Sequence, residues 1–211
     1  MIDLIFPVEN THEWHKANLE NNANDYSKYA RKHGLEIIDA LQETCAKIYY
    51  HPYVPFEGQT IKYGVISVDD MIRDLNERSH LYVAGRAHKP MATILENEKI
   101  DEAMRNNRNS AVNTALLFLP EEFSKMDLYM KIANLSYMGD SRKMLRGEPK
   151  DKVGRIVKGS REGFENIYAP IINSKKDILQ ALNGDKIQQT FEPRETANLY
   201  YSLPSHLREV A

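Results

Sequence analysis

Anion-binding groups are concentrated in one short run, residues 82–90. Arg86 offers a planar fork of donors and Lys89 a compact point charge, and such a pair suits the oxygens of a phosphate. Gly85 precedes them, and a glycine allows the backbone to approach a ligand closely. The same residue types are common in a solvated turn with two surface cations, so both interpretations stay open.

Asp3 interrupts an otherwise apolar segment, residues 1–8, that is typical of a strand. A buried carboxylate is costly unless it is paired or bound to a cation, and Mg²⁺ sites use one or two carboxylates with substrate phosphates. A strand whose second face meets solvent explains Asp3 equally well. Lys62 lies between Ile61 and Tyr63, so it is a positive charge in an apolar strand, as Asp3 is a negative one. The two side chains are compatible with an ion pair, or with a phosphate clamp opposite a metal ligand.

The histidines and the single cysteine give weaker signals. Only His12 and His15 lie close together, and no cysteine or carboxylate cluster has zinc spacing, so a structural zinc site is not expected. Cys45 falls on the apolar face of a predicted helix, which indicates a packed thiol and not a nucleophile. With one cysteine, no intramolecular disulfide is possible.

The composition is that of an ordinary globular protein. The chain has 211 residues, of which 42% are hydrophobic and 27% charged, with a net charge of −2. This length suits one large domain or two small ones, and the charge gives no support for bulk coating of nucleic acid. No apolar run approaches the roughly 20 residues that a membrane-spanning helix needs.

One stretch is locally basic. Residues 140–162 hold eight Lys or Arg and four Asp or Glu, in a chain that is acidic overall. Each basic residue near an anionic membrane surface contributes about 1 kcal/mol, so we expect this stretch to bind such a membrane. A solvated loop accounts for the charge equally well.

Two kinds of pattern organise the chain. In the first part we expect a strand over residues 1–8, a helix from Leu35 to about Tyr49, a break at residues 51–55, and a strand over 61–68 followed by a helix capped by Asp69 or Asp70. Mixed strands and helices therefore predict one domain over residues 1–105. The remainder, residues 106–211, predicts a helical domain.

The helical part has its own start and stop signals. We expect a helix from Asn109 that ends before Pro120, and a second helix that begins at the Ser124–Asp127 capping box and buries Leu128, Ile132 and Leu135. Residues 174–177 are expected to start a third helix, with Gly184 as its C-terminal cap.

Taken together, these segments resemble one family. Those that recur there in the same order are MIDLIF (1–6), WH (14–15) with Asn18, KYGVI (62–66), GRAHKP (85–90), NSA (109–111), ALLFLPE (115–121), FS (123–124) and LSYMGDSR (135–142). The chain is similar to the mitochondrial phosphatidate cytidylyltransferases, also called mitochondrial translocator assembly and maintenance proteins. The resemblance runs from residue 1 to about residue 170.

The resemblance implies an α/β fold, with a nucleotidyltransferase-like mixed-sheet domain followed by a helical, winged-helix-like domain. It implies that CTP and phosphatidic acid give CDP-diacylglycerol and pyrophosphate, with Mg²⁺, on the matrix side of the mitochondrial inner membrane, and that the product feeds cardiolipin synthesis. The roles it implies are catalytic for Asp3, Lys62 and Lys89, metal binding for Asp3, and substrate binding for His15, Asn18, Arg86, Lys89, Asp140 and Arg142.

The sequence departs from the family pattern in three places, one of which is the family's C-terminal tail after Pro204, which we expect to be absent here. The family's Gly-Ser-Gly nucleotide-binding turn precedes the segment that matches Met1, so we expect this chain to lack its start. The family's Asn-Pro-x-His-Tyr-Ser run appears as NANDYS at residues 22–27, without the proline and the histidine. A non-catalytic lipid-binding or scaffold protein of the same fold is the alternative. A helix-turn-helix nucleic-acid binder is disfavoured, because Lys125 and Lys131 are the only cations between Ser124 and Leu135.

Overall fold

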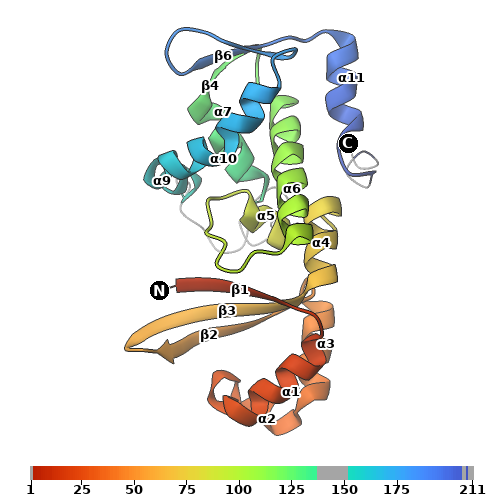
Figure 1. Ribbon diagram of the computed structural model, residues 1–211, viewed down its shortest axis with the longest axis vertical. Helices are drawn as coiled ribbons and strands as arrows, with labels where there is room; N and C mark the ends of the chain where they lie inside the picture. The colour runs from red at the N-terminus through yellow and green to blue at the C-terminus, as the bar shows by residue number, and fades with distance from the viewer. Residues whose placement is uncertain (1, 137–151, 206–207, 209–211) are drawn as a thin grey trace. The chain divides into compact units, whose positions relative to one another are not determined.

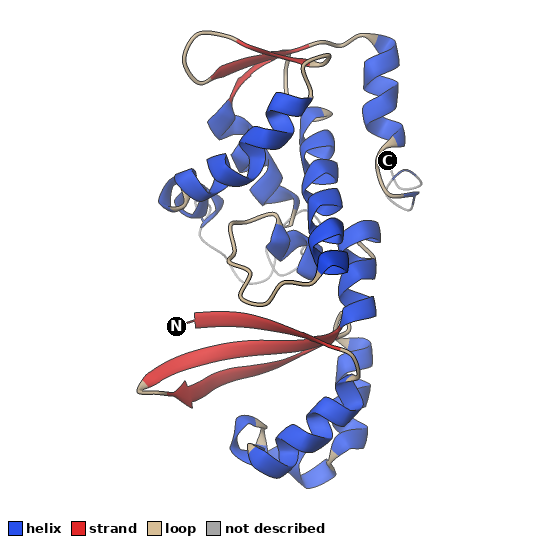
Figure 2. Ribbon diagram, in the orientation of Figure 1, coloured by secondary structure: helices blue, strands red, loops and turns tan. Residues whose placement is uncertain are grey.

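The computed structural model describes residues 2–136, 152–205 and 208. The chain divides into two compact units, Met1–Arg73 and Asp74–Ala211. The described residues form a mixed α/β structure with ten α-helices and two three-stranded sheets (Figures 1 and 2). Within them, no helix is both long enough and apolar enough to cross a membrane.

The first unit is built around a sheet with the strand order β1-β3-β2. Its strands are β1 (Ile2–Val8), β2 (Ile48–Phe56) and β3 (Gln59–Ser67). The central strand β3 runs parallel to β1 and antiparallel to β2. Because side chains alternate along a strand, Leu4, Phe6 and Tyr63 share one face of the sheet, where Trp14 packs against them.

Three α-helices complete the first unit and lie on one side of its sheet (Figure 1). They are α1 (Thr11–Asn21), α2 (Lys28–His33) and α3 (Leu35–Thr44), with a short 3₁₀ turn at Ala23–Asp25. Asn10 caps α1 and Ser27 caps α2, each by accepting a hydrogen bond from a backbone N–H of the first turn. These helices account for the polar segment after the first strand, to which the sequence pattern assigned no element.

The expected helix from Leu35 to Tyr49 is too long. It ends at Thr44, because Ala46 and Lys47 take positive φ angles of 57° and 61° that an α-helix cannot continue. Cys45 is therefore exposed beyond the helix, and the expectation of a packed thiol is wrong. Residues 51–55, where we expected a break in regular structure, belong to strand β2 instead. The pairing of β2 with β3 is irregular between His51 and Val54.

Helix α4 (Val68–Glu77) is divided between the two units. Its cap is Ser67, whose Oγ accepts from the backbone N–H of Asp70 at 3.0 Å, and not Asp69 or Asp70 as expected. The second unit then contains α5 (Val83–Ala87), α6 (Glu98–Leu116), α7 (Lys125–Leu135), α9 (Lys152–Gly159), α10 (Arg161–Ser174) and α11 (Pro193–Tyr201).

A small antiparallel sheet completes the second unit, with the strand order β4-β6-β5. Its strands are β4 (Glu122–Ser124), β5 (Leu179–Ala181) and β6 (Lys186–Gln189). The core of the unit is a contiguous apolar cluster that α6, α7 and α10 supply in large part, including Leu116, Ile132 and Phe164. The capping box of α7 is confirmed, since Ser124 and Asp127 satisfy each other's backbone N–H groups.

Several expectations for this unit need correction. Helix α6 is capped by Asn97 and not by Asn109, and residue 105, where the sequence pattern placed the domain boundary, lies inside α6. Residues 174–177 do not start a helix, because α10 ends at Ser174 and strand β5 follows. Gly184, with a φ of 72°, lies in the turn between β5 and β6.

Candidate functional site

The parallel register of the first unit places Asp3 opposite Lys62. The two residues are Cα partners on β1 and β3, so their side chains project from the same face of the sheet. Lys62 Nζ lies 4.0 Å from the centroid of the Tyr50 ring, a cation–π contact that orients the ammonium group. The ring fits because residue 64 is glycine, where a Cβ would lie 2.7 Å from Tyr50 Cε1. Asp3 and Lys62 are therefore neighbours on one face of the sheet, an arrangement compatible with the ion pair or the phosphate clamp that the sequence left open.

His15 and Asn18 belong to a buried polar network on α1. The amide of Gln42 donates to the carbonyls of Lys47 and Val65, which leaves Gln42 Oε1 to accept from His15 Nε2 at 3.0 Å. His15 Nδ1 must then accept from the Tyr26 hydroxyl at 2.8 Å. Burial lowers the pKa of His15, which agrees with a neutral ring.

The network continues to the sheet. Asn18 Nδ2 donates to the hydroxyls of Tyr26 and Tyr63, and Tyr63 donates to Asp25 Oδ2 at 2.5 Å. Tyr63 follows Lys62 along β3, so this network lies on the opposite face of the sheet from Asp3 and Lys62. The polar groups of His15 and Asn18 are bonded to neighbours within the first unit. A substrate-binding role for these two residues stays a prediction.

Burial also keeps His51 neutral, with its pKa lowered to about 4. Its Nδ1 donates to the carbonyl of Asp25, and its ring stacks on Tyr63 with centroids 4.3 Å apart. Its Nε2 has no hydrogen-bond partner among the described residues. A buried nitrogen of this kind is destabilising, because it loses its hydrogen bonds to water and gains none from the protein.

Helix α5 of the second unit carries Gly85 and Arg86 and is held by a buried carboxylate that the sequence did not reveal. Asp74 Oδ1 accepts from the backbone N–H groups of residues 80 and 81, and Oδ2 accepts from Val83 and Ala84, at 2.8–3.0 Å. Two of these charge-assisted bonds satisfy N–H groups of the first helical turn, which have no partner within the helix, and the other two hold the segment just before it. No local pattern identifies this role, because an aspartate near a helix C-terminus is ordinary in a sequence.

The solvated-turn interpretation of residues 82–90 is wrong. Val83, Ala84, Gly85, Ala87 and His88 are buried. A Cβ on residue 85 would lie 2.7 Å from Cβ of Ser136, so this glycine allows close packing of α5 on the end of α7 and not the approach of a ligand there.

Lys89 lies next to α5 and is half-buried, and its Nζ donates to Ser136 Oγ at 3.1 Å. Burial, followed by the charges of Arg86 and Lys152, lowers the pKa of Lys89 to about 8. Arg86 and Lys152 are therefore near enough to act electrostatically on Lys89. A concentration of positive charge of this kind attracts phosphate.

A second set of basic groups lies deeper in this unit. Arg78 is 4% exposed and donates from Nη1 to Thr114 Oγ1 at 3.1 Å, while its Nε and Nη2 have no partner among the described residues. Burial lowers the pKa of Arg78 to about 10 and that of nearby His88 to about 3. The His88 ring contacts Asn107, whose amide donates to the carbonyl of Ala84 at 2.9 Å. These residues anchor α5 on α6.

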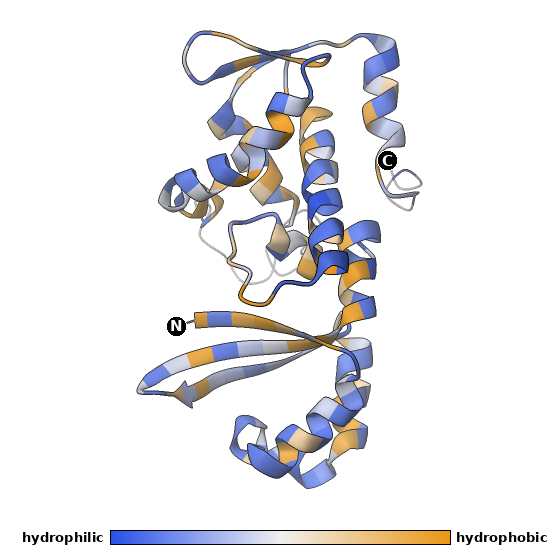
Figure 3. Ribbon diagram, viewed as in Figure 1, coloured by the Kyte–Doolittle hydropathy of each residue, from blue (hydrophilic) through white to orange (hydrophobic). Residues whose placement is uncertain are grey.

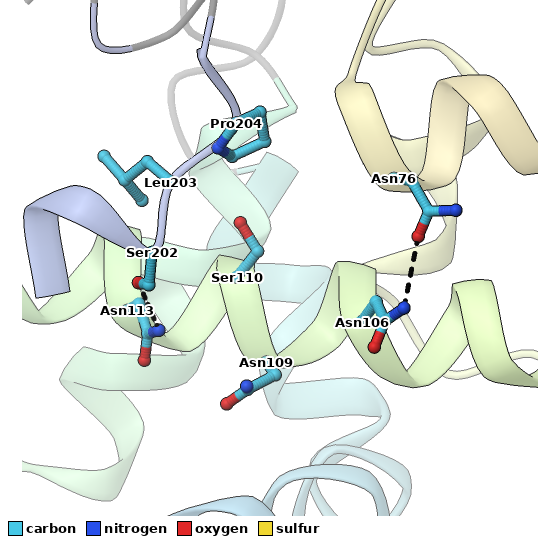
Figure 4. A pocket seen from close by; sticks show the side chains of 8 residues that line it. All are labelled: Asn76, Asn106, Asn109, Ser110, Asn113, Ser202, Leu203 and Pro204. Atoms are coloured by element: carbon cyan, nitrogen blue, oxygen red, sulfur yellow. Dashed lines mark hydrogen bonds between the residues drawn. The ribbon is translucent and has the colours of Figure 1, made fainter. Parts of the chain in front are cut away.

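A polar pocket of about 330 Å³ opens elsewhere in the second unit (Figure 4). It is lined by carboxamides and hydroxyls of α4, α6 and the segment after α11, namely Asn76, Asn106, Asn109, Ser110, Asn113 and Ser202, with Leu203 and Pro204. Asn113 donates to Ser202 Oγ at 2.7 Å, but Asn113 Oδ1 and Ser110 Oγ have no partner among the described residues. With no charged lining residue, this pocket is suited to water or neutral polar groups.

The remaining predicted site residues, Asp140 and Arg142, lie outside the described residues, as do residues 140–151 of the basic stretch 140–162. Within the described ranges, no cluster of three or more His, Cys, Asp or Glu side chains is placed to hold a metal ion. A metal-binding role for Asp3 stays a prediction.

Comparison with known proteins assigns the chain to a family. A family model described as "Phosphatidate cytidylyltransferase, mitochondrial" matches residues 1–211. A Xenopus laevis protein of that name is 41% identical over 212 residues, which cover 99% of this chain and 62% of the relative. The Mus musculus protein is 37% identical with the same coverage, and that of Schizosaccharomyces pombe is 33% identical over 198 residues, 93% of this chain and 50% of the relative. The chain thus spans less than two thirds of the length of these relatives.

Proposed function

Because the chain belongs to the family of mitochondrial phosphatidate cytidylyltransferases, we propose that it makes CDP-diacylglycerol and pyrophosphate from CTP and phosphatidic acid. A phosphate oxygen of phosphatidic acid forms a bond to the α-phosphorus of CTP, and the bond from that phosphorus to the bridging oxygen breaks. The observation that carries this proposal is the family match over all 211 residues. The relatives named above are longer than this chain, so the experiment must test whether this chain is itself active.

The geometry of the first unit supports this chemistry. Nucleotidyl transfer at phosphorus needs positioned charge and no covalent nucleophile, since negative charge develops on the leaving pyrophosphate. Asp3 and Lys62 present a carboxylate and an ammonium group from neighbouring positions on two paired strands. Strands are rigid, so they hold such groups in a fixed geometry. Lys62 is suited to a phosphate oxygen and Asp3 to a cation.

Mg²⁺ is the cofactor that the family resemblance implies. Asp3 fits one way of binding it, in which substrate phosphates supply most of the ligands. A single exposed carboxylate, Asp3, suits an ion that substrate phosphates hold in large part, and it does not suit a cage of protein ligands. When bound, the ion would neutralise charge on the triphosphate. Lys62 would add a second positive charge beside it, without being a ligand.

In the second unit, Arg86 and Lys89 are the cations that we assign to phosphate groups of the substrates. Local structure fixes the position of α5, because Asp74 accepts from its first N–H groups and Gly85 packs on Ser136. Arg86 supplies a bidentate fork and Lys89 a point charge. We also propose that the first unit is nucleotidyltransferase-like and that the second, with helices followed by a small antiparallel sheet, is winged-helix-like.

We place the reaction on the matrix side of the mitochondrial inner membrane, with the protein bound peripherally and its product used in cardiolipin synthesis. The relatives are named as mitochondrial proteins, and the absence of a spanning helix among the described residues agrees with peripheral attachment. Phosphatidic acid is a membrane lipid, so an enzyme that uses it must work at a bilayer surface.

The test is to assay the protein, as expressed from its own gene, with labelled CTP, phosphatidate vesicles and Mg²⁺. We expect labelled CDP-diacylglycerol and release of pyrophosphate. Asp3→Asn, which keeps the shape of the side chain, should lower the rate on the order of 100-fold, because it removes an essential electrostatic contact. Glu9→Gln, at an exposed position just beyond the same strand, is the matched control and should keep its rate.

The outcomes separate the two functions under consideration. Asp3→Asn with near-normal turnover and an unchanged thermal melt would show that Asp3 is the wrong carboxylate. A wild-type protein that binds phosphatidate vesicles but forms no CDP-diacylglycerol would replace the enzyme by the non-catalytic lipid-binding protein.

A further inference from the structure

The segment that joins α5 to α6 exposes two neighbouring aliphatic side chains. Residues 90–95, Pro-Met-Ala-Thr-Ile-Leu, carry no charge and lie between Lys89 and Glu96. Ile94 is 77% and Leu95 87% exposed, more than any other aliphatic side chain in the part of the chain that the structure describes. Figure 3 shows the loop changing from orange to deep blue where it enters α6. Ile94 and Leu95 therefore form the most exposed apolar part of the loop, which we call its tip.

Both ends of this loop are fixed to the second unit. Before it, the carbonyl of His88 accepts from the Tyr168 hydroxyl at 2.8 Å. At its start, Pro90 packs on Gly163 of α10, where a Cβ would lie only 2.8 Å from the proline ring. At its end, Asn97 Oδ1 accepts from the backbone N–H of Ile100 at 3.2 Å and caps α6. The anchored ends hold the tip away from the core of its own unit.

Exposing two adjacent aliphatic side chains in this way is unfavourable in water. Full burial of one Ile or Leu side chain contributes about 1.5–3 kcal/mol. Single exposed apolar residues are common, whereas contiguous ones indicate a surface that meets another apolar phase. Ile94 and Leu95 are contiguous, and Met91 of the same loop is 39% exposed. Such a tip needs an apolar occupant.

The charges around the loop favour a lipid bilayer as that occupant. Lys89 stands at the start of the loop, within electrostatic reach of Arg86 and Lys152. Helix α9, which begins at Lys152, also exposes Arg155 and Lys158 and has no acidic residue. Apolar side chains beside cations match a bilayer with anionic headgroups, where the former enter the acyl boundary and the latter bind phosphate.

We propose that the 90–95 loop inserts Ile94 and Leu95 into the membrane interface and anchors the protein beside its lipid substrate. This inference rests on the proposed function for the identity of that lipid, but the insertion itself does not require catalysis. Glu96 and Glu98, at the entry to α6, set the limit of insertion, because carboxylates stay at the headgroup level. The loop thus acts as a short, shallow anchor.

Binding to vesicles is the first test. Wild-type protein and Ile94→Ser/Leu95→Ser are floated with vesicles of phosphatidylcholine containing phosphatidate. We expect the double variant to lose at least about tenfold in affinity, since the apolar contribution of both side chains is removed. Tyr53→Ser is the control, because Tyr53 is as exposed as Ile94 but lies on β2. Equal vesicle affinity of wild type and the double variant, with equal melting temperatures, would overturn the proposal.

A second measurement reports insertion directly. Leu95→Cys in a Cys45→Ser background carries a single thiol for an environment-sensitive fluorophore. Adding the same vesicles should shift its emission to the blue, and the same label at residue 53 should not shift. If emission at residue 95 shifts only when another protein is added, a protein partner occupies the loop and the bilayer assignment is wrong.

The assay of product keeps this inference distinct from the proposed function. With phosphatidate in vesicles, the double variant should turn over more slowly, whereas with short-chain phosphatidate dispersed in water it should match wild type. If wild type makes no CDP-diacylglycerol but the fluorophore still reports insertion, the proposed function fails and the inference stands. Equal loss of turnover on both substrate forms would contradict the anchoring role.

Discussion

At the scale of single residues, Lys89 combines a cation suited to phosphate with surroundings that disfavour its charge. Burial is the main cause, and Arg86 and Lys152 add like-charge repulsion, so the pKa of Lys89 falls from 10.5 to about 8. A group whose pKa is lower in the folded state favours the unfolded state wherever it is protonated. Its cost is therefore complete below about pH 8 and is relieved as the pH rises toward 10.5. An anion bound nearby would remove this cost, which is a property expected of a binding site.

Lys89→Met should therefore stabilise the protein at neutral pH. The gain in unfolding free energy should shrink as the pH rises from about 8 and should vanish above 10.5, where the wild-type amine is neutral in both states. Denaturant unfolding at a series of pH values measures this difference. Lys99→Met, at an exposed position of α6, should show no such trend. A Lys89→Met protein whose stability relative to wild type is the same across the series would contradict the lowered pKa.

At the scale of elements, the sequence correctly predicted features that depend on residues close together along the chain. The capping box of α7 and its buried residues Leu128 and Ile132 were predictable, because caps and stripes depend on residues three or four positions apart. Strand β2 was not predictable, because the hydrogen bonds that stabilise it are made to β3. That pairing also tolerates an irregularity after His51. Helix α5 was missed for a similar reason, because Asp74 satisfies its first N–H groups from another element.

The same distinction holds for the candidate site. The sequence identified Asp3 and Lys62 by residue type, and the pairing of β1 with β3 then placed them opposite each other. For His15 and Asn18, no sequence pattern indicated the bonds to Gln42 and Tyr63, which are distant along the chain. Residue types can be recognised locally, whereas hydrogen-bond partners are set by tertiary packing.

Packing of α5 on α7 gives a prediction at this scale. Gly85→Ala places a Cβ 2.7 Å from Cβ and 3.3 Å from Cα of Ser136, so the two helices must separate. We expect a loss of about 1–3 kcal/mol in unfolding free energy, typical of overpacking. Gly159→Ala is the matched control, since a Cβ there meets nothing within 4 Å and alanine favours the helix. Gly85→Ala/Ser136→Gly should regain part of the loss, and a Gly85→Ala protein as stable as wild type would disprove the close contact.

At the scale of the whole molecule, attraction to an anionic membrane cannot come from net charge, which is −2. It must come from an uneven distribution of charge, because a local excess of cations attracts anions over about a Debye length. Helix α9 supplies such an excess with Lys152, Arg155 and Lys158. The 90–95 loop, in contrast, contributes apolar contact that salt does not screen. The proposed membrane binding therefore has two separable terms, one electrostatic and one apolar.

Reversing charge on α9 should remove one of these terms and leave the other. Arg155→Glu/Lys158→Glu changes two exposed side chains, and each basic residue near an anionic surface contributes about 1 kcal/mol. Affinity for phosphatidate-containing vesicles should fall and lose most of its dependence on salt, while the smaller affinity for pure phosphatidylcholine should not change. Arg105→Glu/Arg194→Glu, two exposed arginines on α6 and α11, is the control for net charge alone. Combining the α9 variant with Ile94→Ser/Leu95→Ser should give losses that add, because apolar insertion and electrostatic attraction act independently. If the α9 variant and this control weaken binding equally, the attraction follows net charge and the basic face of α9 has no specific role.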